Sequence, residues 1–517
     1  MKKGLLLLNV LGMVLSLALP VREAFGEPKR GGTLTMATRK DVSTMNPLVR
    51  TFSTDQSIRD LIYEALLVLD ESGAIKPQLA ESYEVSKDGK VYTFRLRRGV
   101  KFHNGQEMTA EDALYAINYT LNPKNGAYGR SRLALVEGAK VADKYTLKIY
   151  LKSRSAAFLS ALTDIKAFSV IPKDSIQSIK PKVFPVGTGP FRFVDWQVKQ
   201  RVVFDLNKDY WGQKPYVDRV ILRPIRNSTV RFTALRAGDV DIIERTPYEW
   251  VKQVLSGKFK GLGTAKAATS GYRALFFNVL APPFDNKKLR LAVAHGMDKK
   301  TMLQAAFFGF GETADQKYPN GHFWYVKGLK SPTYDPAKAR KLLKESGYKG
   351  EKIVMKIEKG ETVEAMSTAF QAQMKKIGMN IELAVYEYGA RRAQIRSGDT
   401  TVDMVGGGYY ADPISTYRSQ YMCGQDPKKR ASNWSGYCDK QVAKWFEELD
   451  IELDQKKRQE ILGRIVAKIN DDVPVISIGF VPRFFTFRDY VKGFKTNSSG
   501  GRFVWGGGGL TRTWLDK

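Results

Sequence analysis

Residues 77–105 read PQLAESYEVSKDGKVYTFRLRRGVKFHNG and carry the clearest local signals in this chain of 517 residues. Within them Tyr92, Phe94 and Leu96 alternate with polar side chains, which is typical of a strand with one buried face. The stretch ends on a Phe-His-Asn-Gly turn, where we expect His103 to hydrogen-bond a loop rather than to catalyse. The stretch therefore predicts a half-buried strand followed by a turn.

Helix signals surround this strand and recur along the chain. A capping box, Thr109 to Asp112, predicts a helix running toward Leu121. Another helix is predicted to be capped by Asp335, to begin at Pro336 and to end at Gly347. Helical spacing also predicts helices over 53–69, 442–449 and 461–469, and strands are predicted at 31–37 and 475–480. Alternating helices and strands over this length favour an α/β fold with several lobes.

The first 26 residues have the features of a signal peptide. Two lysines precede an apolar run, Gly4 to Leu19, which Pro20 ends. Ala24 and Gly26 place small residues where a signal peptidase reads, so we predict cleavage near Gly26/Glu27 and export to the periplasm. The alternative is an uncleaved membrane anchor, because the run approaches the length of a short span. No later apolar run is long enough to cross a bilayer.

The formal net charge of the chain is +30, yet its basic residues are spread among acidic ones. A strongly basic chain can bind nucleic acid or other anionic polymers. Neither a basic helix nor an RNA-binding signature is present. A solvated basic surface is therefore the preferred interpretation, with no nucleic-acid partner; binding to an anionic polymer stays as the alternative.

Motifs that indicate catalysis or cofactor binding are missing from the sequence. The three histidines, His103, His295 and His322, do not pair at metal-ligand spacing. There is no nucleophile elbow and no phosphate-binding loop. Ser346 and Lys349 match a Ser-x-x-Lys pattern, but at a predicted helix terminus. We therefore expect no enzyme activity, no catalytic residue, no metal and no cofactor.

Several longer stretches resemble one known family over nearly the whole chain after residue 26. They are residues 62–66, 77–90, 92–105, 186–191, 209–212, 235–241, 278–290 and 334–348, with Asn104 where Asp is usual. In these stretches the sequence is similar to the bacterial extracellular solute-binding proteins of family 5, which serve peptide, dipeptide and nickel ABC importers.

The resemblance implies a periplasmic-binding-protein-like α/β fold with two lobes and an extra domain on the first. It places lobe I at 27–70, 183–280 and 493–517, the extra domain at 71–182 and lobe II at 281–492. It also implies a monomer that encloses a small molecule or peptide between its lobes and delivers it to the membrane permease subunits of an ATP-driven importer.

The same resemblance implies three walls of a ligand site. The first is residues 41–46, with Asp41, Ser43, Thr44 and Met45; a capped surface turn is the alternative. The second is the strand 272–277 beginning at Tyr272, one side of which we expect in the core. The third is residues 405–413, with Tyr409, Tyr410 and Asp412. Arg391, with Arg392 and Arg396, could serve an anion, although arginines on a helix surface are the preferred interpretation.

The third wall departs from the peptide-binding pattern. Those relatives carry an Asp that accepts the peptide's amino group where this chain has Tyr409, and a Trp where it has Gly406. We therefore expect either a peptide held differently, through Asp41 or Asp412, or a ligand without a free α-amine. A sugar conjugate, an opine-like compound and an anionic ligand all remain open.

Cys423 and Cys438 are the only cysteines and stand 15 residues apart. An exported chain meets an oxidising compartment, and relatives in the family carry a similar pair. We predict a disulfide between them.

Overall fold

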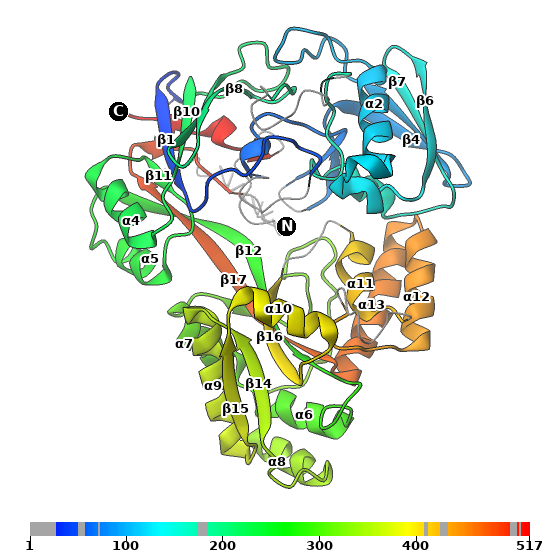
Figure 1. Ribbon diagram of the computed structural model, residues 1–517, viewed down its shortest axis with the longest axis vertical. Coiled ribbons are helices and arrows are strands. Elements are labelled where there is room, and N and C mark those ends of the chain that lie inside the picture. The colour runs from blue at the N-terminus through cyan, green and yellow to red at the C-terminus, as the bar shows by residue number, and fades with distance from the viewer. Residues whose placement is uncertain are drawn as a thin grey trace, which may run out of the picture.

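The computed structural model describes residues 27–49, 57–70, 73–173, 175, 185–407, 412–423, 433–496, 504–505 and 508–517. The predicted signal peptide lies outside these residues. Two bodies stand one above the other in Figure 1, and two long strands run between them. Among the described residues, no helix has both the length and the apolar character needed to cross a membrane.

One sheet of nine strands extends through both bodies, in the order β16-β12-β17-β11-β1-β10-β9-β8, with β13 added beside β17. Its strands are β1 Thr33–Thr38, β8 Phe191–Gln197, β9 Arg201–Leu206, β10 Arg219–Pro224, β11 Ile242–Ile243, β12 Leu262–Phe277, β13 Glu312–Thr313, β16 Val402–Gly407 and β17 Val475–Arg488. In the upper body β1 lies parallel to both β10 and β11. Helices α4 Ser228–Ala237 and α5 Tyr248–Leu255 flank this part.

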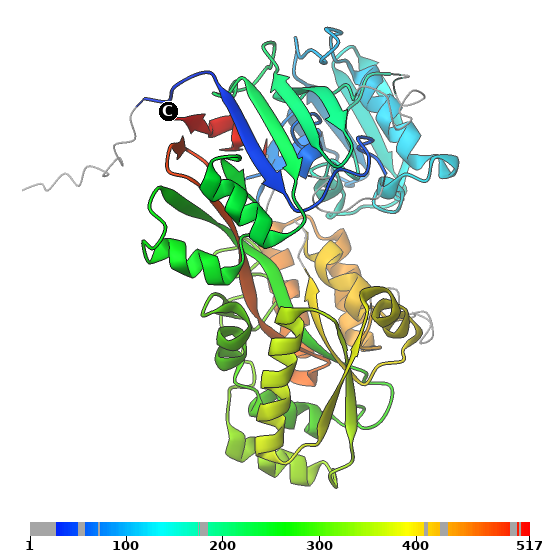
Figure 2. The ribbon, with the colours of Figure 1, turned by 60° about the vertical axis from the view of Figure 1, so that its left-hand side comes forward.

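The two long strands β12 and β17 are antiparallel and cross between the bodies (Figure 2). One end of β17 pairs with β11 above, and the far end of β12 pairs with β16 below. Their ladder is interrupted between the pairs Ala267–Arg483 and Gly271–Val481, around Pro482. Because proline has no N–H to donate, it marks a break in strand pairing. The two bodies are thus joined at an irregular point in an otherwise continuous sheet.

A separate four-stranded sheet, in the order β4-β5-β7-β6, lies beside the upper body. Its strands are β4 Ala80–Val85, β5 Val91–Leu96, β6 Val136–Asp143 and β7 Thr146–Leu151, packed with α2 Ala110–Leu121. The predicted strand and capping box are both confirmed, with the Asp112 carboxylate 2.8 Å from Thr109 N. His103 joins this unit to the upper body, since its Nε2 lies 3.0 Å from Gly189 O.

The lower body contains β14 Ile353–Glu358 parallel to β15 Ile381–Tyr386, beside β16. Its helices are α6 Lys287–Gly296, α7 Lys299–Phe307, α8 Pro336–Glu345, α9 Glu361–Ile377, α10 Tyr388–Ser397, α11 Ser419–Tyr421, α12 Lys440–Ile451 and α13 Gln455–Asp472. Asp335 caps α8, and Gly347 follows it with a φ of 80°. These helix predictions are confirmed, as is Ser346 at a helix end. The strand predicted at 475–480 continues to Arg488.

Of the helix predicted over 53–69, the structure describes residues 57–69, and the prediction is wrong after residue 59. Residues 57–59 are helical, but residues 67–69 form a short strand, β2, paired with β3 Ile75–Pro77. The carbonyls between them bond distant partners: those of Leu61 and Ile62 accept from Phe191 N and Gly189 N. Apolar spacing correctly indicated burial, but the neighbours bury this segment on all sides. Tertiary contacts therefore replaced the helix.

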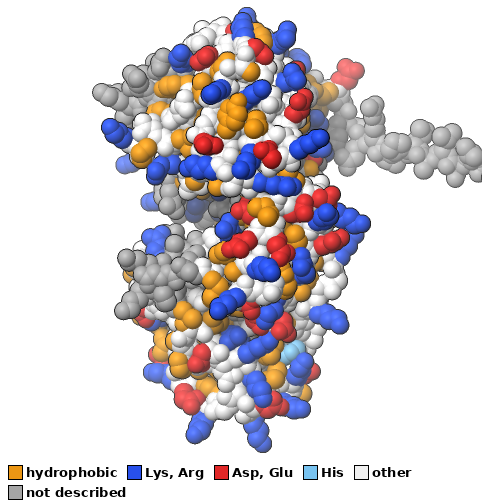
Figure 3. Space-filling model, turned by 90° about the vertical axis from the view of Figure 1, so that its right-hand side faces the viewer, with side chains coloured by type: hydrophobic (Ala, Val, Ile, Leu, Met, Phe, Trp, Pro, Cys, Tyr) orange, Lys and Arg blue, Asp and Glu red, His pale blue; other side chains and the backbone are white. Residues whose placement is uncertain are grey.

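The fold is α/β with two lobes, as predicted. Figure 3 shows the molecule narrowing where the two lobes meet. On that face Lys and Arg side chains are scattered over both lobes with acidic ones among them, which fits the expected solvated basic surface.

Candidate functional site

The ends of strands from both lobes meet where β12 and β17 cross. In lobe I the carboxyl ends of the parallel strands β1 and β11 lead into residues 39–46 and 244–247. In lobe II the carboxyl end of β16 lies beside Tyr272 and Arg273, next to the interrupted part of β12. In α/β folds the carboxyl ends of strands are where ligands bind. The candidate site is therefore the cleft between the lobes.

The Asp41 side chain is engaged within lobe I. One carboxylate oxygen accepts from Trp196 Nε1 at 3.3 Å and the other from Lys199 N at 2.6 Å. Thr44 Oγ1 accepts from the backbone N of Asn46, and Met45 is buried. These contacts hold the segment as a capped turn, and Ser43 and Thr44 are its more open members.

Tyr272 lies in the core of lobe II rather than in open contact with the cleft. Its hydroxyl bonds Ser477 Oγ at 2.7 Å, and its ring packs on Phe480. The predicted alternation of 272–277 is present, but the helices of lobe II cover both faces, so both sets of side chains are largely buried. Arg273 is the exception: it is half-buried at the hinge.

Arg391 does not lie on a helix surface, so that interpretation is wrong for this residue. Its side chain is 1% exposed and pairs with the Asp403 carboxylate at 2.9 Å, with a further bond to Thr400 Oγ1. Arg396 is exposed, as expected, and Arg392 lies over the ring of Trp434. Because Arg391 already has a buried counter-charge, it holds α10 to β16.

Asp412 is likewise paired within lobe II. Its carboxylate bonds Arg458 of α13 at 2.8 Å and accepts from Ile414 N at 2.8 Å. Both side chains are almost fully buried. Tyr409 and Tyr410, which precede Asp412, lie outside the described residues.

The predicted disulfide between Cys423 and Cys438 is confirmed. It joins the segment after α11 to the residue that precedes the cap of α12.

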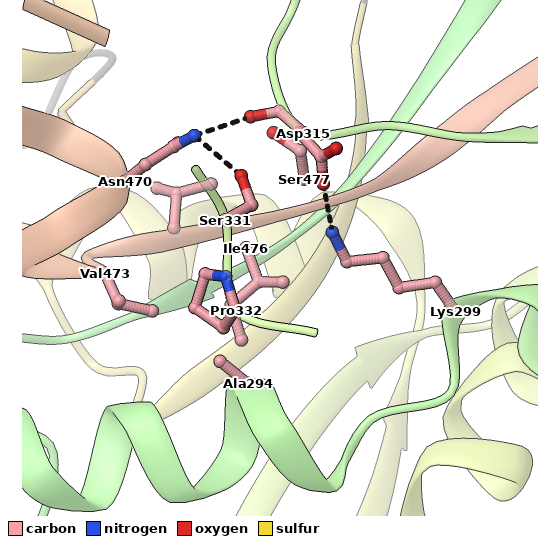
Figure 4. Close-up of a pocket in the computed structure, with 10 residues that line it drawn as sticks. Ala294, Lys299, Asp315, Ser331, Pro332, Asn470, Val473, Ile476 and Ser477 are labelled. Atoms are coloured by element: carbon pink, nitrogen blue, oxygen red, sulfur yellow. Dashed lines mark hydrogen bonds and ion pairs between the residues drawn. The ribbon is translucent and has the colours of Figure 1, made fainter. Parts of the chain in front are cut away.

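A small cavity inside lobe II, of about 20 Å³, is separate from the cleft. In Figure 4, Lys299 contacts Asp315 and Asn470 contacts Ser331 and the Asp315 carbonyl around it. A space of this size holds one water molecule rather than a solute. Within the described part of the chain, no group of three or more His, Cys, Asp or Glu side chains is placed to hold a metal ion.

Four arginines near the hinge were missed by sequence reasoning: Arg39, Arg245, Arg273 and Arg483. They come from four segments up to 444 positions apart, and no local pattern connects them. Only Arg273 stood inside a stretch that the sequence had singled out.

Two lobes joined by crossing strands, with the carboxyl ends of strands facing the cleft, define a two-lobed binding protein. Residues 74–430 match the family described as bacterial extracellular solute-binding proteins, family 5 middle, and the chain belongs to this family. It is thus a substrate-binding component of the ABC-importer type.

Individual relatives agree with this assignment. The chain is 27% identical over 455 residues to the dipeptide-binding protein of Escherichia coli K12, covering 82% of this chain and 84% of that protein. It is 30% identical over 357 residues to a glutathione-binding protein of Pectobacterium atrosepticum, covering 68% and 69%. A periplasmic binding protein from Helicobacter pylori, solved with the peptide STSA, superposes with a TM-score of 0.78 at 26% identity, covering 95% and 99%.

Proposed function

We propose that this protein captures a peptide or peptide-like solute in the cleft between its lobes, in the periplasm, and presents it to the permease of an ATP-driven importer. In this role the protein binds and releases its solute without chemical change. It acts as a monomer, with lobe I, the extra domain and lobe II close to the boundaries that the sequence predicts. The end of β12 from Tyr272 onward, which pairs with β16, is counted with lobe II.

The crossing of β12 and β17 is the observation that carries this proposal. A solute that contacts residues of both lobes can do so only when they approach, so its binding energy stabilises the closed arrangement. The interrupted ladder around Pro482 is where the two strands can bend with the fewest paired hydrogen bonds to distort.

The solute class follows from the relatives and from one difference. The two curated relatives described above are named for binding a dipeptide and glutathione. In this chain the Asp412 carboxylate is already paired with Arg458. A buried ammonium without a counter-charge is costly, so a free α-amine would have to be held elsewhere. A solute without that amine therefore stays the second candidate.

Small-angle scattering and calorimetry test this function together. Solutes extracted from the purified protein and identified by mass spectrometry supply the ligand for both. We expect micromolar or tighter binding and a smaller radius of gyration at saturation. An unchanged radius with bound solute would contradict lobe closure, and a modified solute recovered after incubation would contradict simple binding. Di- to pentapeptides and their amino-acetylated forms then decide whether an α-amine is recognised.

A further inference from the structure

Four arginine side chains from both lobes gather at the hinge end of the cleft. Arg39 follows β1 and Arg245 follows β11, so both extend from the carboxyl ends of lobe I strands. Arg483 lies on β17 beside the interrupted ladder, and Arg273 lies on β12 in lobe II. All four are neither fully buried nor fully exposed.

A series of contacts connects these positions step by step. Arg39 N donates to Glu244 Oε1 at 2.5 Å, and Glu244 precedes Arg245. Thr246 N donates to the carbonyl of Phe484, next to Arg483. The Tyr248 hydroxyl donates to Pro482 O, and its ring packs edge-on against Phe307. The centroid of the Phe307 ring lies 5.6 Å from Arg273 Cζ.

The guanidinium groups of this cluster act on one another, since Arg245 is within electrostatic reach of Arg39, Arg273 and Arg483. Glu244 acts in the opposite sense on Arg245 and Arg483, and Glu358 on Arg273. Burial, then the neighbouring Arg245, lowers the pKa of Arg483 to about 10, and burial lowers the pKa of Arg245 and Arg273. Arg483 therefore keeps its charge at neutral pH, as guanidinium groups in proteins do. Like charges held together out of water are unfavourable unless an anion joins them.

The surrounding structure holds the lobe I part of the cluster rigidly. Arg231, which is 2% exposed, donates to the carbonyls of Ile225, Arg226, Glu244 and Arg245. Arg245 has a φ of 53°, in the left-handed region that non-glycine residues rarely adopt. Strained positions of this kind persist where the surroundings enforce them, often at ligand sites.

Two further features leave hydrogen-bonding capacity in the cluster. The Nε of Arg39 is buried and has no hydrogen-bond partner. On the lobe II side, a Cβ on Gly406 would lie 2.2 Å from Arg273 Nη1, so the glycine at this position makes room for the guanidinium. Among the described residues, the one hydrogen bond of the Arg273 side chain goes to its neighbour's carbonyl, Tyr272 O, at 3.4 Å.

We propose that Arg39, Arg245, Arg273 and Arg483 form an oxyanion-binding subsite, so that the solute carries a carboxylate or phosphate group at the hinge end of the cleft. This inference rests on the proposed function and specifies the solute class for it. Guanidinium groups bind carboxylate and phosphate through paired hydrogen bonds. Because the arginines come from both lobes, the same anion also favours the closed arrangement.

The test compares matched probes on matched variants. Trialanine, trialaninamide, citrate and inorganic pyrophosphate are titrated calorimetrically at up to 5 mM into wild-type protein stripped of solute by partial unfolding and refolding. Arg245→Gln and Arg273→Gln each remove one charge from the cluster. Arg340→Gln removes the same charge from an exposed position of α8 in lobe II. Circular dichroism and the Tm establish that each variant is folded.

We expect at least one of the three oxyanion probes, trialanine, citrate and pyrophosphate, to bind. If trialanine binds, trialaninamide should bind at least tenfold more weakly. Each cluster variant should lose about tenfold to a hundredfold in affinity for the probe that binds. Arg340→Gln keeps wild-type affinity. Trialanine binding without pyrophosphate or citrate identifies a carboxylate of a peptide-like solute; pyrophosphate binding alone identifies a phosphorylated one. Absence of binding by all three oxyanion probes, or equal losses in Arg340→Gln, overturns the subsite. A neutral or cationic solute extracted from the protein would overturn it as well, while leaving solute capture intact.

Discussion

The Ser155 hydroxyl lies 3.1 Å from a carboxylate oxygen of Asp450, although the two residues are 295 positions apart. Ser155 follows β7 in the extra domain, whereas Asp450 belongs to α12 of lobe II. Beside this bond, Ala156 N donates to the Asp450 carbonyl at 2.7 Å, and Arg418 pairs with the other carboxylate oxygen at 2.8 Å. The segment that follows β7 therefore contacts α12 of lobe II directly, and we expect this contact to help hold the two lobes together.

Replacing Asp450 with alanine is expected to weaken the closed arrangement without unfolding either lobe. The substitution removes the side-chain bonds to Ser155 and Arg418 but keeps the backbone bond. We therefore expect the closed arrangement to lose about 1 kcal/mol of stability relative to the open one, and solute affinity to fall threefold to tenfold. Scattering should show a larger radius of gyration. Glu448→Ala, on the same helix and paired only at the surface with Arg464, is the control. Equal radii for the two variants would show that the contact does not hold the lobes.

Burial of the Lys317 side chain leads us to expect that the stability of the folded protein rises with pH above neutrality. The side chain is buried and bonds Thr416 O and Gln420 Oε1, between the rings of Tyr417 and Tyr421. Burial lowers the pKa of its ammonium to about 7. Between pH 7 and 10 the unfolded chain keeps the proton that the folded protein gives up, so stability rises with pH, by about 2 kcal/mol from pH 7 to 9.

Urea unfolding at pH 7, 8 and 9 measures this slope. Lys317→Met should remove the rise and be at least as stable as the wild type at pH 7, because no ammonium is then buried. Lys300→Met, at an exposed position of α7, should keep the wild-type slope. If the Lys317 variant shows the same rise as the wild type, its ammonium stays protonated in the fold.

Arg391 is expected to matter for folding and not directly for the solute. Arg391→Gln leaves the Asp403 carboxylate buried without its partner; burial already raises the pKa of this group to about 7. We expect a loss of about 3 kcal/mol in the free energy of unfolding. Arg396→Gln on the same helix is exposed and should change stability by less than about 0.5 kcal/mol. A tenfold loss of solute affinity in folded Arg391→Gln would instead show that Arg391 contributes to ligand binding.

The disulfide is expected to contribute measurably to stability. It closes a loop of 15 residues, which gives about 3 kcal/mol in the chain-entropy model. The double variant Cys423→Ser/Cys438→Ser should lose this amount in urea unfolding, and reductant should destabilise the wild type alone. Two free thiols per denatured, unreduced wild-type chain would show that the bridge does not form in the exported protein.

Processing is tested at the amino terminus of the exported protein. The apolar run before Ala24-Phe25-Gly26 leads us to expect Glu27 as the first residue after export. Amino-terminal sequencing of the periplasmic fraction checks this. Recovery of the chain with Met1 in the membrane fraction would establish the anchor instead.

Sequence reasoning succeeded where the signal was local. The strand Val91–Leu96, the capping box at Thr109 and the ends of α8 depend on residues within a few positions of one another. The disulfide could be predicted because the chain has only two cysteines. Family resemblance then supplied the two-lobed fold, because its landmarks are distributed over the chain.

The candidate site depended on contacts that no local pattern records. Arg391 and Asp412 are charged residues of the kind that bind ligands, yet each has a buried partner of opposite charge. Arg391 pairs with Asp403, and Asp412 pairs with Arg458. Residues 61–62 have helical spacing, yet their carbonyls bond residues 189–191.

The sequence by itself determined the class of protein and the ends of many helices and strands, because capping, periodicity and turn residues act over short distances. Only the tertiary structure decided which charges are available to a solute. A charged side chain is free or satisfied according to what the fold brings against it. In this protein the fold gives Asp412 and Arg391 buried partners of opposite charge, and brings four arginines from distant segments together at the hinge.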